Sequence, residues 1–201
     1  MPARILSLPA LTRRLAGARR RGQRIAFTNG CFDLIHAGHV HYLEQVKQLA
    51  DLLVVGLNSD ASMRRLKGPG RPLVPQRDRA RVLAGLRAVD YVTIFQEETP
   101  LRVITAIRPE VLAKGADWSV RRIVGAALVR RAGGRVVRVP FLAGRSTSRL
   151  IQRIVSRYGA DWRPSAAFRA ASGSATRRAG ARPDGLALPP VGRRTAPLVR
   201  P

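Results

Sequence analysis

Apolar and polar positions follow two alternating patterns between residues 24 and 158. Leu52–Asn58 is an almost unbroken apolar run, typical of a strand buried on both faces of a parallel sheet. His39–Ala50 instead places Val40, Leu43 and Val46 at helical spacing. The whole pattern predicts strands at residues 24–29, 52–58, 90–95, 110–114 and 135–140, and helices at residues 39–50, 59–66, 75–89, 100–108, 119–132 and 144–158.

Strands that alternate with helices at this spacing form βαβ units, which pair into a parallel sheet through right-handed crossovers. The sequence therefore predicts one α/β domain at residues 24–158, with a Rossmann-like parallel five-stranded sheet and helices on both faces. Ligands of such sheets bind beyond the carboxyl ends of the strands. The polar motifs described below follow strand ends, so we expect them to form one site.

The segments on either side of this domain have different patterns. Residues 1–23 carry Leu8, Leu11 and Leu15 at helical spacing among several arginines, which predicts a basic N-terminal helix packed on the domain or on a partner subunit. Residues 159–201 are rich in Arg, Ala, Pro and Gly without periodicity. This composition is typical of a disordered tail.

The composition indicates the compartment. The single cysteine, Cys31, excludes an internal disulfide framework and agrees with a reducing cytoplasm. No apolar run approaches the roughly 20 residues that a membrane-spanning helix needs, and arginines interrupt any signal-peptide core near the N-terminus. We therefore expect a soluble cytoplasmic protein without a membrane partner.

The net charge of +25 by itself suggests a polyanionic partner such as nucleic acid. The excess is not one block, because residues 159–201 hold eight arginines and two aspartates while the remainder is spread over the chain. Aromatic residues make up only 5% of the chain, which leaves little surface on which bases can stack. Nucleic-acid or polyanion binding is therefore kept as an alternative of a different class.

The strongest motif lies where the first predicted strand meets the first helix, at Ile25–His41. A strand, a tight loop and a helix N-terminus offer free backbone N–H groups and a positive helix end to a phosphate. His36 and His39 are three residues apart, so both can face one phosphate and donate hydrogen bonds without a metal. A helix-end histidine pair and a metal site are the alternatives, and zinc is disfavoured because only Asp33 lies nearby.

Two further segments carry groups suited to phosphate. Lys67 and Arg71 border a glycine- and proline-rich loop, as expected for cations that a mobile segment brings to a phosphate, although a solvated turn fits the same pattern. Ser146, Thr147 and Ser148 open the last predicted helix, where hydroxyls and free N–H groups can bind phosphate oxygens. Ordinary N-capping explains one of these hydroxyls but not the set.

Thr28–His39 together with Asn58–Pro72 resembles the heptose 1-phosphate adenylyltransferases of bacterial heptose-nucleotide synthesis. These enzymes form part of the cytidylyltransferase-like branch of the HxGH nucleotidyltransferase superfamily. The likeness extends from Arg24 to Tyr158 and leaves both terminal segments outside it. It implies the HxGH nucleotidyltransferase fold for this domain.

The resemblance also implies a reaction. Heptose 1-phosphate would attack the α-phosphate of ATP in line, with Mg²⁺ as cofactor, to give ADP-heptose and pyrophosphate. The nearest alternative is a related transfer, from CTP to glycerol 3-phosphate or to another phosphate monoester. In this family the module is often fused to a sugar kinase. For this sequence we expect a separate kinase to supply the substrate. The choice between ATP and GTP and the formation of a homodimer are left open.

Further residues are assigned by the resemblance alone. Lys114–Trp118 is similar to the family's Lys-Gly-Gly-Asp-Trp turn, with Ala116 as a departure. Arg79 matches an arginine that reaches phosphate in this superfamily. Arg121 and Arg122 stand where the heptose branch is expected to carry an acidic residue, so acceptor recognition is less well supported than nucleotide binding.

Two residues of the first motif need a choice between roles. Cys31 is assigned to the nucleotide pocket through its backbone, because no general base accompanies its thiol. Asp33 is suited to orient the loop, to help hold Mg²⁺ or to touch the acceptor, and the sequence does not choose between these. The assignment is His36, His39 and Lys67 as catalytic; Gly30, Cys31, Phe32, Gly38, Arg79, Asp117, Trp118, Arg145, Ser146, Thr147 and Ser148 as nucleotide-binding; and Asp33, Arg71 and Lys114 as substrate-binding, with no metal ligand.

Overall fold

The computed structural model describes residues 4–140, 142 and 144–159. The tail expected to be disordered lies outside the described residues, apart from Gly159. The chain divides into two units, residues 1–156 and 157–201, and the sheet belongs to the first. Among the helices of the described residues, none has the length and apolar character needed to cross a membrane.

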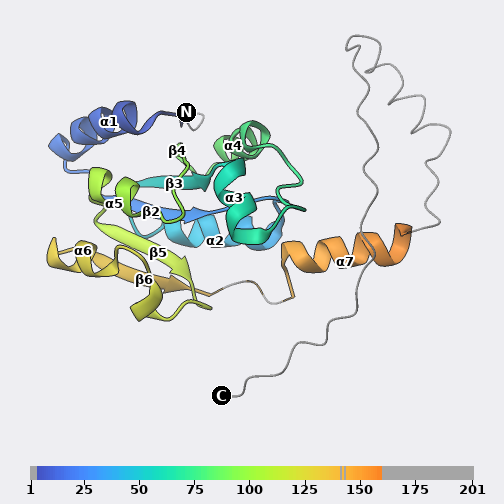
Figure 1. Cartoon of the computed structure of the whole chain (residues 1–201). Coiled ribbons are helices and arrows are strands. Elements are labelled where there is room, and N and C mark those ends of the chain that lie inside the picture. The colour runs from blue at the N-terminus through green and yellow to red at the C-terminus, as the bar shows by residue number, and fades with distance from the viewer. Residues whose placement is uncertain (1–3, 141, 143, 160–201) are drawn as a thin grey trace, which may run out of the picture. The chain divides into compact units, whose positions relative to one another are not determined.

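Within the described residues, six parallel strands form one sheet in the order β1-β4-β3-β2-β5-β6 (Figure 1). In the central strand, Phe27 pairs with Val54 on one side and with Leu112 on the other. The direction in which the chain adds strands reverses at this strand, and sheets of this kind bind ligands at that point. The five predicted strands are confirmed, and a short edge strand adds a sixth. Their bounds are β1 Arg4–Ile5, β2 Ile25–Gly30, β3 Leu52–Asn58, β4 Tyr91–Phe95, β5 Val111–Gly115 and β6 Arg135–Val139.

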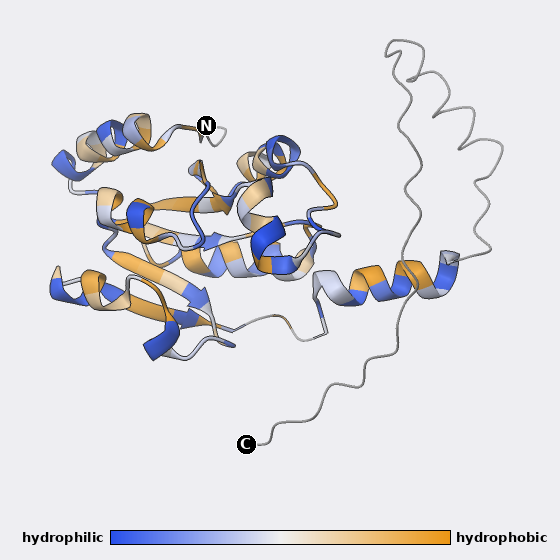
Figure 2. Cartoon of the chain, viewed as in Figure 1, coloured by the Kyte–Doolittle hydropathy of each residue, from blue (hydrophilic) through white to orange (hydrophobic). Residues whose placement is uncertain are grey.

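Helices cover both faces of the sheet, as predicted (Figure 1). On one face α2 (Ala37–Lys47) and α4 (Gln76–Gly85) pack against the apolar strands, which are largely orange in Figure 2. On the other face lie α1 (Leu8–Arg20), α5 (Leu101–Ile107) and α6 (Ala126–Arg131). The chain also forms α3 (Asp60–Lys67) after β3 and α7 (Thr147–Tyr158) after β6.

The single helix predicted at residues 119–132 is wrong in its first half. A short 3₁₀ helix at Val120–Arg122 comes first, and α6 begins only after Gly125. Gly125 has a φ of 83°, in the left-handed region, and a Cβ at this position would lie 2.8 Å from Ile104 of α5. The close approach to α5 thus requires glycine here, and the left-handed backbone interrupts the helix.

Helix α1 is part of the domain core. Leu11 and Leu15 are fully buried against the sheet and α5. The Arg19 guanidinium donates hydrogen bonds to the Glu110 carboxylate at 2.8 Å and to the Ile107 carbonyl at 2.6 Å. The sequence left open whether this helix packs on the domain or on a partner subunit. In the structure it packs on the domain.

Candidate active site

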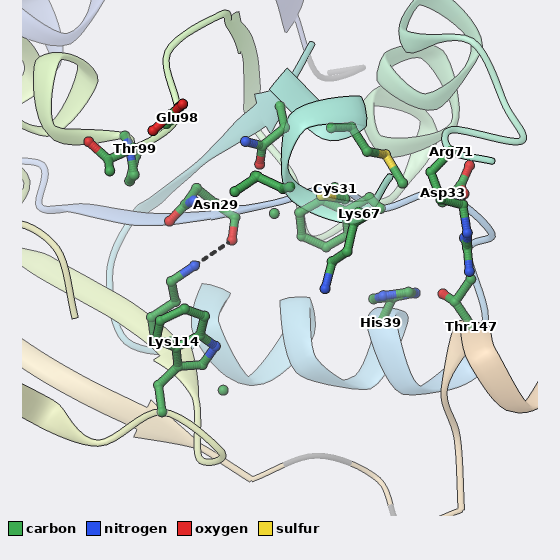
Figure 3. A pocket seen from close by; sticks show the side chains of 18 of the residues that line it. Asn29, Cys31, Asp33, His39, Lys67, Arg71, Glu98, Thr99, Lys114 and Thr147 are labelled. Carbon is green, nitrogen blue, oxygen red and sulfur yellow. Dashed lines mark hydrogen bonds and ion pairs between the residues drawn. The ribbon is translucent and has the colours of Figure 1, made fainter. Parts of the chain in front are cut away.

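A cavity of about 590 Å³ opens beyond the carboxyl ends of the central strands (Figure 3). Gly30 ends β2, Asn58 ends β3 and Gly115 ends β5, and all three line the cavity. Small-molecule sites commonly have volumes of roughly 300–1,000 Å³. The assigned residues that the structure brings together in this lining are Gly30, Cys31, Phe32, Asp33, His39, Lys67, Arg71, Lys114, Trp118, Thr147 and Ser148.

Two stacked histidines stand at the N-terminus of α2. His36 is the N-cap residue, and its Nδ1 accepts a hydrogen bond from the Gly38 N–H at 3.1 Å. The His36 and His39 rings are stacked with their centroids 4.0 Å apart, and the Phe32 ring lies 5.3 Å from that of His39. His39 lines the cavity, whereas His36 and Gly38 are not part of the lining. Of the two histidines predicted to be catalytic, His39 is therefore the one that a ligand in the cavity can contact directly.

Both imidazoles are held in the neutral form. Burial, together with a smaller effect of the neighbouring His36, lowers the pKa of His39 to about 4. Burial also lowers the pKa of His36, as does the charge of Arg145. Each ring thus has one N–H to donate at pH 7. The His39 Nδ1 atom is buried and has no hydrogen-bond partner within the described residues.

Acid is expected to destabilise the protein through His39. The folded-state pKa of about 4 lies below the ordinary value of 6.5, so the unfolded chain binds more protons between these two values. The neutral His39 ring makes its full contribution to the stability of the folded protein above pH 6.5. The free energy of unfolding therefore falls as the pH falls from 6.5 towards 4. Urea unfolding of the wild type and of His39→Gln at pH 7 and pH 5 measures this. The wild type should lose more stability on acidification, and equal losses would contradict the lowered pKa.

Gly38 leaves room for the stacked rings. A Cβ on Gly38 would lie 2.9 Å from Cε1 of His36 and 3.0 Å from Cβ of Arg145. Gly38→Ala should therefore displace the histidines and destabilise the fold by about 1–3 kcal/mol, the usual cost of overpacking. The matched control is Gly70→Ala, because a Cβ on Gly70 meets nothing within 4 Å. Thermal unfolding of both variants decides the question, and a Gly38→Ala protein as stable as the control would show that the rings have space.

Asp33 holds the loop between α3 and α4. Its buried carboxylate accepts hydrogen bonds from the backbone N–H groups of Leu73 at 2.9 Å and Val74 at 3.0 Å, and from the Arg71 guanidinium at 2.5 Å. Burial acts to raise the pKa of the Asp33 carboxyl, but the three donors outweigh burial and the pKa is lowered. Of the three roles left open by the sequence, these contacts favour orientation of the loop. They also place Arg71 in an ion pair within the cavity lining (Figure 3).

Arg79 is not in the cavity wall, so its surroundings do not support the prediction that it binds nucleotide phosphate, which stays a prediction. Its side chain is fully buried. The guanidinium donates to the carbonyl oxygens of Cys31, Asn58 and Val74 and to the Asp60 carboxylate. Because these acceptors surround it, Arg79 joins the ends of β2 and β3 to α3 and to the loop before α4. The planar fork of donors in a guanidinium suits such a set of acceptors.

Lys67 and Lys114 supply positive charge to the cavity. Within the described part of the chain neither lysine is in an ion pair. Lys114 Nζ donates to the carbonyl oxygen of Asn29 at 3.0 Å, as drawn in Figure 3, and lies 5.3 Å from the Trp118 ring centroid. Burial lowers the pKa of Lys114 to about 8, although the Asp117 carboxylate acts in the opposite direction. Lys114 is therefore mainly charged at pH 7 and suited to an anionic ligand.

Cys31 lacks the features of a nucleophile. Its thiol is partly buried, and burial raises its pKa even though the charges of Lys67 and Arg79 act to lower it. The thiol thus stays protonated at pH 7, in agreement with the rejection of covalent catalysis on the basis of sequence.

The N-terminus of α7 contributes two hydroxyl residues to the lining, Thr147 and Ser148. The Ser146 hydroxyl is instead used in capping, because its oxygen accepts the Arg149 N–H at 3.2 Å. Asp117, Arg145 and Ser146, which the sequence assigned to nucleotide binding, lie outside the lining.

Several lining residues were not predicted from the sequence. Tyr42 extends from α2 and its hydroxyl lies 2.8 Å from that of Thr28, an arrangement that looks like ordinary core packing in sequence. The β4–α5 connection also reaches the cavity, although its Thr-Pro pair resembled only a helix start. For the missed residues at the ends of β2, β3 and β5, the position at the end of a predicted strand was the one signal that the sequence offered. The lining residues missed are Asn29, Tyr42, Asn58, Met63, Leu66, Glu98, Thr99, Pro100, Gly115 and Val124.

Comparison with known proteins places this site in context. Residues 27–153 match the family described as Cytidylyltransferase-like. The chain is 54% identical over 140 residues to the bifunctional protein HldE of Syntrophotalea carbinolica, covering 70% of this chain and 29% of that protein. It is 58% identical over 134 residues to the bifunctional protein HldE of Magnetococcus marinus, covering 67% and 28%. The chain thus spans less than a third of the length of these relatives.

One solved structure supports the fold alone. The pantoate-beta-alanine ligase of Francisella tularensis superposes with a TM-score of 0.50 at 13% identity, covering 73% of this chain and 69% of that chain.

Proposed function

The chain belongs to the cytidylyltransferase-like family and is a nucleotidyltransferase, and from this premise we propose that it joins heptose 1-phosphate and ATP to give ADP-heptose and pyrophosphate. The observation that carries the proposal is the placement of the two segments that resemble heptose 1-phosphate adenylyltransferases. Thr28–His39 and Asn58–Pro72 lie far apart in sequence, yet residues of both line the same cavity. The similarity to two HldE proteins at 54% and 58% identity supports the same assignment.

The chemistry needs positioning and charge stabilisation rather than covalent catalysis. An ionised phosphate oxygen of heptose 1-phosphate attacks the α-phosphorus of ATP, a new P–O bond forms, and the bond to the β-phosphate breaks as pyrophosphate leaves. The attacking oxygen already carries negative charge, so no general base is required. In this proposal His39 and Lys67 stabilise the charge on the α-phosphate and on the leaving oxygen.

The remaining polar groups fit the two ends of the substrates. Thr147 and Ser148, with the free N–H groups at the start of α7, suit the β- and γ-phosphates of the nucleotide. Lys114 suits the phosphate of the acceptor, because it is mainly charged, half-buried and in no ion pair among the described residues. Mg²⁺ would enter as part of the ATP complex, since the described residues contain no group of three or more His, Cys, Asp or Glu side chains arranged to hold a metal.

The second candidate reaction uses CTP with glycerol 3-phosphate or another phosphate monoester, and the family description itself favours it. Pyrophosphate release from ATP, GTP and CTP, measured against each acceptor with Mg²⁺ present, separates the two. Release with ATP and heptose 1-phosphate alone is the expected result. Release with CTP and glycerol 3-phosphate alone would replace the proposed reaction by the second.

The third candidate, polyanion binding, rests on the net charge of +25. If no nucleotide and acceptor pair releases pyrophosphate, binding to nucleic acid should be measured at 50 mM and 200 mM salt. Binding through phosphate contacts would weaken by orders of magnitude over about this range. Such a result, without transferase activity, would overturn the proposed function.

A further inference from the structure

Helix α7 has the clearest amphipathic pattern among the described helices. At about 100° per residue, its five large apolar side chains fall within an arc of roughly 140°. Three arginines lie together beside this arc, and the helix contains no acidic residue. Figure 2 shows the result as orange bands beside blue ones along α7. The apolar residues are Leu150, Ile151, Ile154, Val155 and Tyr158, and the arginines are Arg149, Arg153 and Arg157.

The apolar face of α7 is uncovered. No residue of this helix is buried, and Ile154, Val155 and Tyr158 are 52%, 62% and 50% exposed. Helix α1 is also rich in arginine, but its leucines Leu11 and Leu15 are fully buried in the domain core. The pattern of α7 is therefore not explained by packing within the described residues, and a contiguous apolar face of this kind usually marks an interaction site.

A second copy of the chain is a poor occupant for this face. The 12 residues of α7 offer a face of roughly 200 Å², at about 1.5 Å per residue and about 10 Å width. Stable interfaces bury about 800 Å² on each partner. Pairing two such helices would also bring arginine rows together in a chain with a net charge of +25.

We propose that α7 binds the surface of an anionic lipid bilayer. Its apolar face would enter the boundary between headgroups and acyl chains, and Arg149, Arg153 and Arg157 would contact lipid phosphates. Basic amphipathic helices bind membranes in this way through buried apolar area and attraction to anionic lipids. The absence of a spanning segment led to the prediction of no membrane partner, but a helix that lies on the surface requires no such segment.

Binding of α7 to a membrane would also fix the position of the cavity. Thr147 and Ser148 open α7 and line the cavity, so a helix bound to the bilayer would hold the nucleotide site next to the membrane surface.

Co-sedimentation of the full-length protein with vesicles tests the proposal. Vesicles of phosphatidylcholine with one quarter phosphatidylglycerol are compared with pure phosphatidylcholine vesicles. The wild type should bind the anionic vesicles and not the neutral ones. Val155→Asp should weaken this binding at least about tenfold, because it places a charge in the buried face. Val82→Asp is the matched control: Val82 is also an exposed helical valine, and its change adds the same charge far from α7 in the sequence.

Both variants retain the arginine-rich tail, so a difference in vesicle binding between them reports on α7 and not on the tail. Equal binding by the two variants would overturn the proposal in favour of the tail. Failure of the wild type to bind anionic vesicles would also overturn it, and so would a Val155→Asp change that converts a dimer to a monomer without altering vesicle binding.

A second variant guards against loss of the helix. Arg153→Gln with Arg157→Gln leaves the apolar face intact and should weaken binding and reduce its dependence on salt. Circular dichroism and a thermal unfolding curve would show that each variant remains folded, and this control does not depend on the identity of the substrates.

Discussion

His39→Ala is expected to lower kcat at least about 100-fold while the protein stays folded. Removing a donor that stabilises charge in a transition state commonly has an effect of this size. The reason lies in the position of His39, which lines the cavity at the N-terminus of α2 and packs against both Phe32 and His36. Pyrophosphate release at saturating nucleotide and acceptor, together with a thermal unfolding curve, measures the effect.

The matched control is His41→Ala. His41 lies on the same helix two residues further on, but its side chain is exposed and it is not part of the cavity lining. Its replacement should leave kcat within about twofold, as expected for a surface change away from the site. If His39→Ala were as active as His41→Ala, the proposed role of His39 would be excluded.

His36 should respond differently from His39. Its Nδ1 caps α2 and its ring supports that of His39, so His36→Ala should lower both activity and stability. Loss of an N-cap costs about 0.5–2 kcal/mol. Activity measured well below the unfolding temperature should still fall about 100-fold if the pair acts together on phosphate.

Arg79→Met is expected to lower the free energy of unfolding by about 3–5 kcal/mol, the usual cost of removing one partner from a buried ion pair. The variant would leave the Asp60 carboxylate without its cation and the carbonyl oxygens of Cys31, Asn58 and Val74 without a donor. Arg79→Lys should recover little of this loss, because an ammonium group cannot reach four acceptors in these directions. Urea unfolding followed by circular dichroism measures both variants.

The neighbouring arginines of α4 provide the controls. Arg77 and Arg81 flank Arg79 in sequence, and both are exposed. Arg77→Met and Arg81→Met should change stability by no more than about 0.5 kcal/mol. A loss of stability at Arg79 no greater than at these two positions would show that its hydrogen bonds contribute little to the fold.

The sequence by itself determined the layered α/β fold and the location of the site. Strands such as Leu52–Asn58 are short, almost unbroken apolar runs, and helices such as α2 have apolar residues at a spacing close to 3.6 residues. Both patterns are local and need no knowledge of distant contacts. The parallel arrangement then places every strand end at one edge of the sheet. For this reason the order of strands and motifs along the chain is enough to predict Cys31, His39 and Lys114 in one site, and all three line the cavity.

The tertiary structure alone decided which polar groups remain available to a ligand. Arg79 fitted a phosphate-binding pattern, yet its donors are used by acceptors from three other segments, up to 48 residues away in sequence. Asp33 likewise pairs with Arg71 and with backbone N–H groups of the same distant loop. Glu98 and Thr99 line the cavity, although no sequence motif marked them. The physical reason is that local patterns record which face of an element is apolar, whereas the pairing of a buried donor depends on acceptors that only the folded chain brings within 3 Å or so of it.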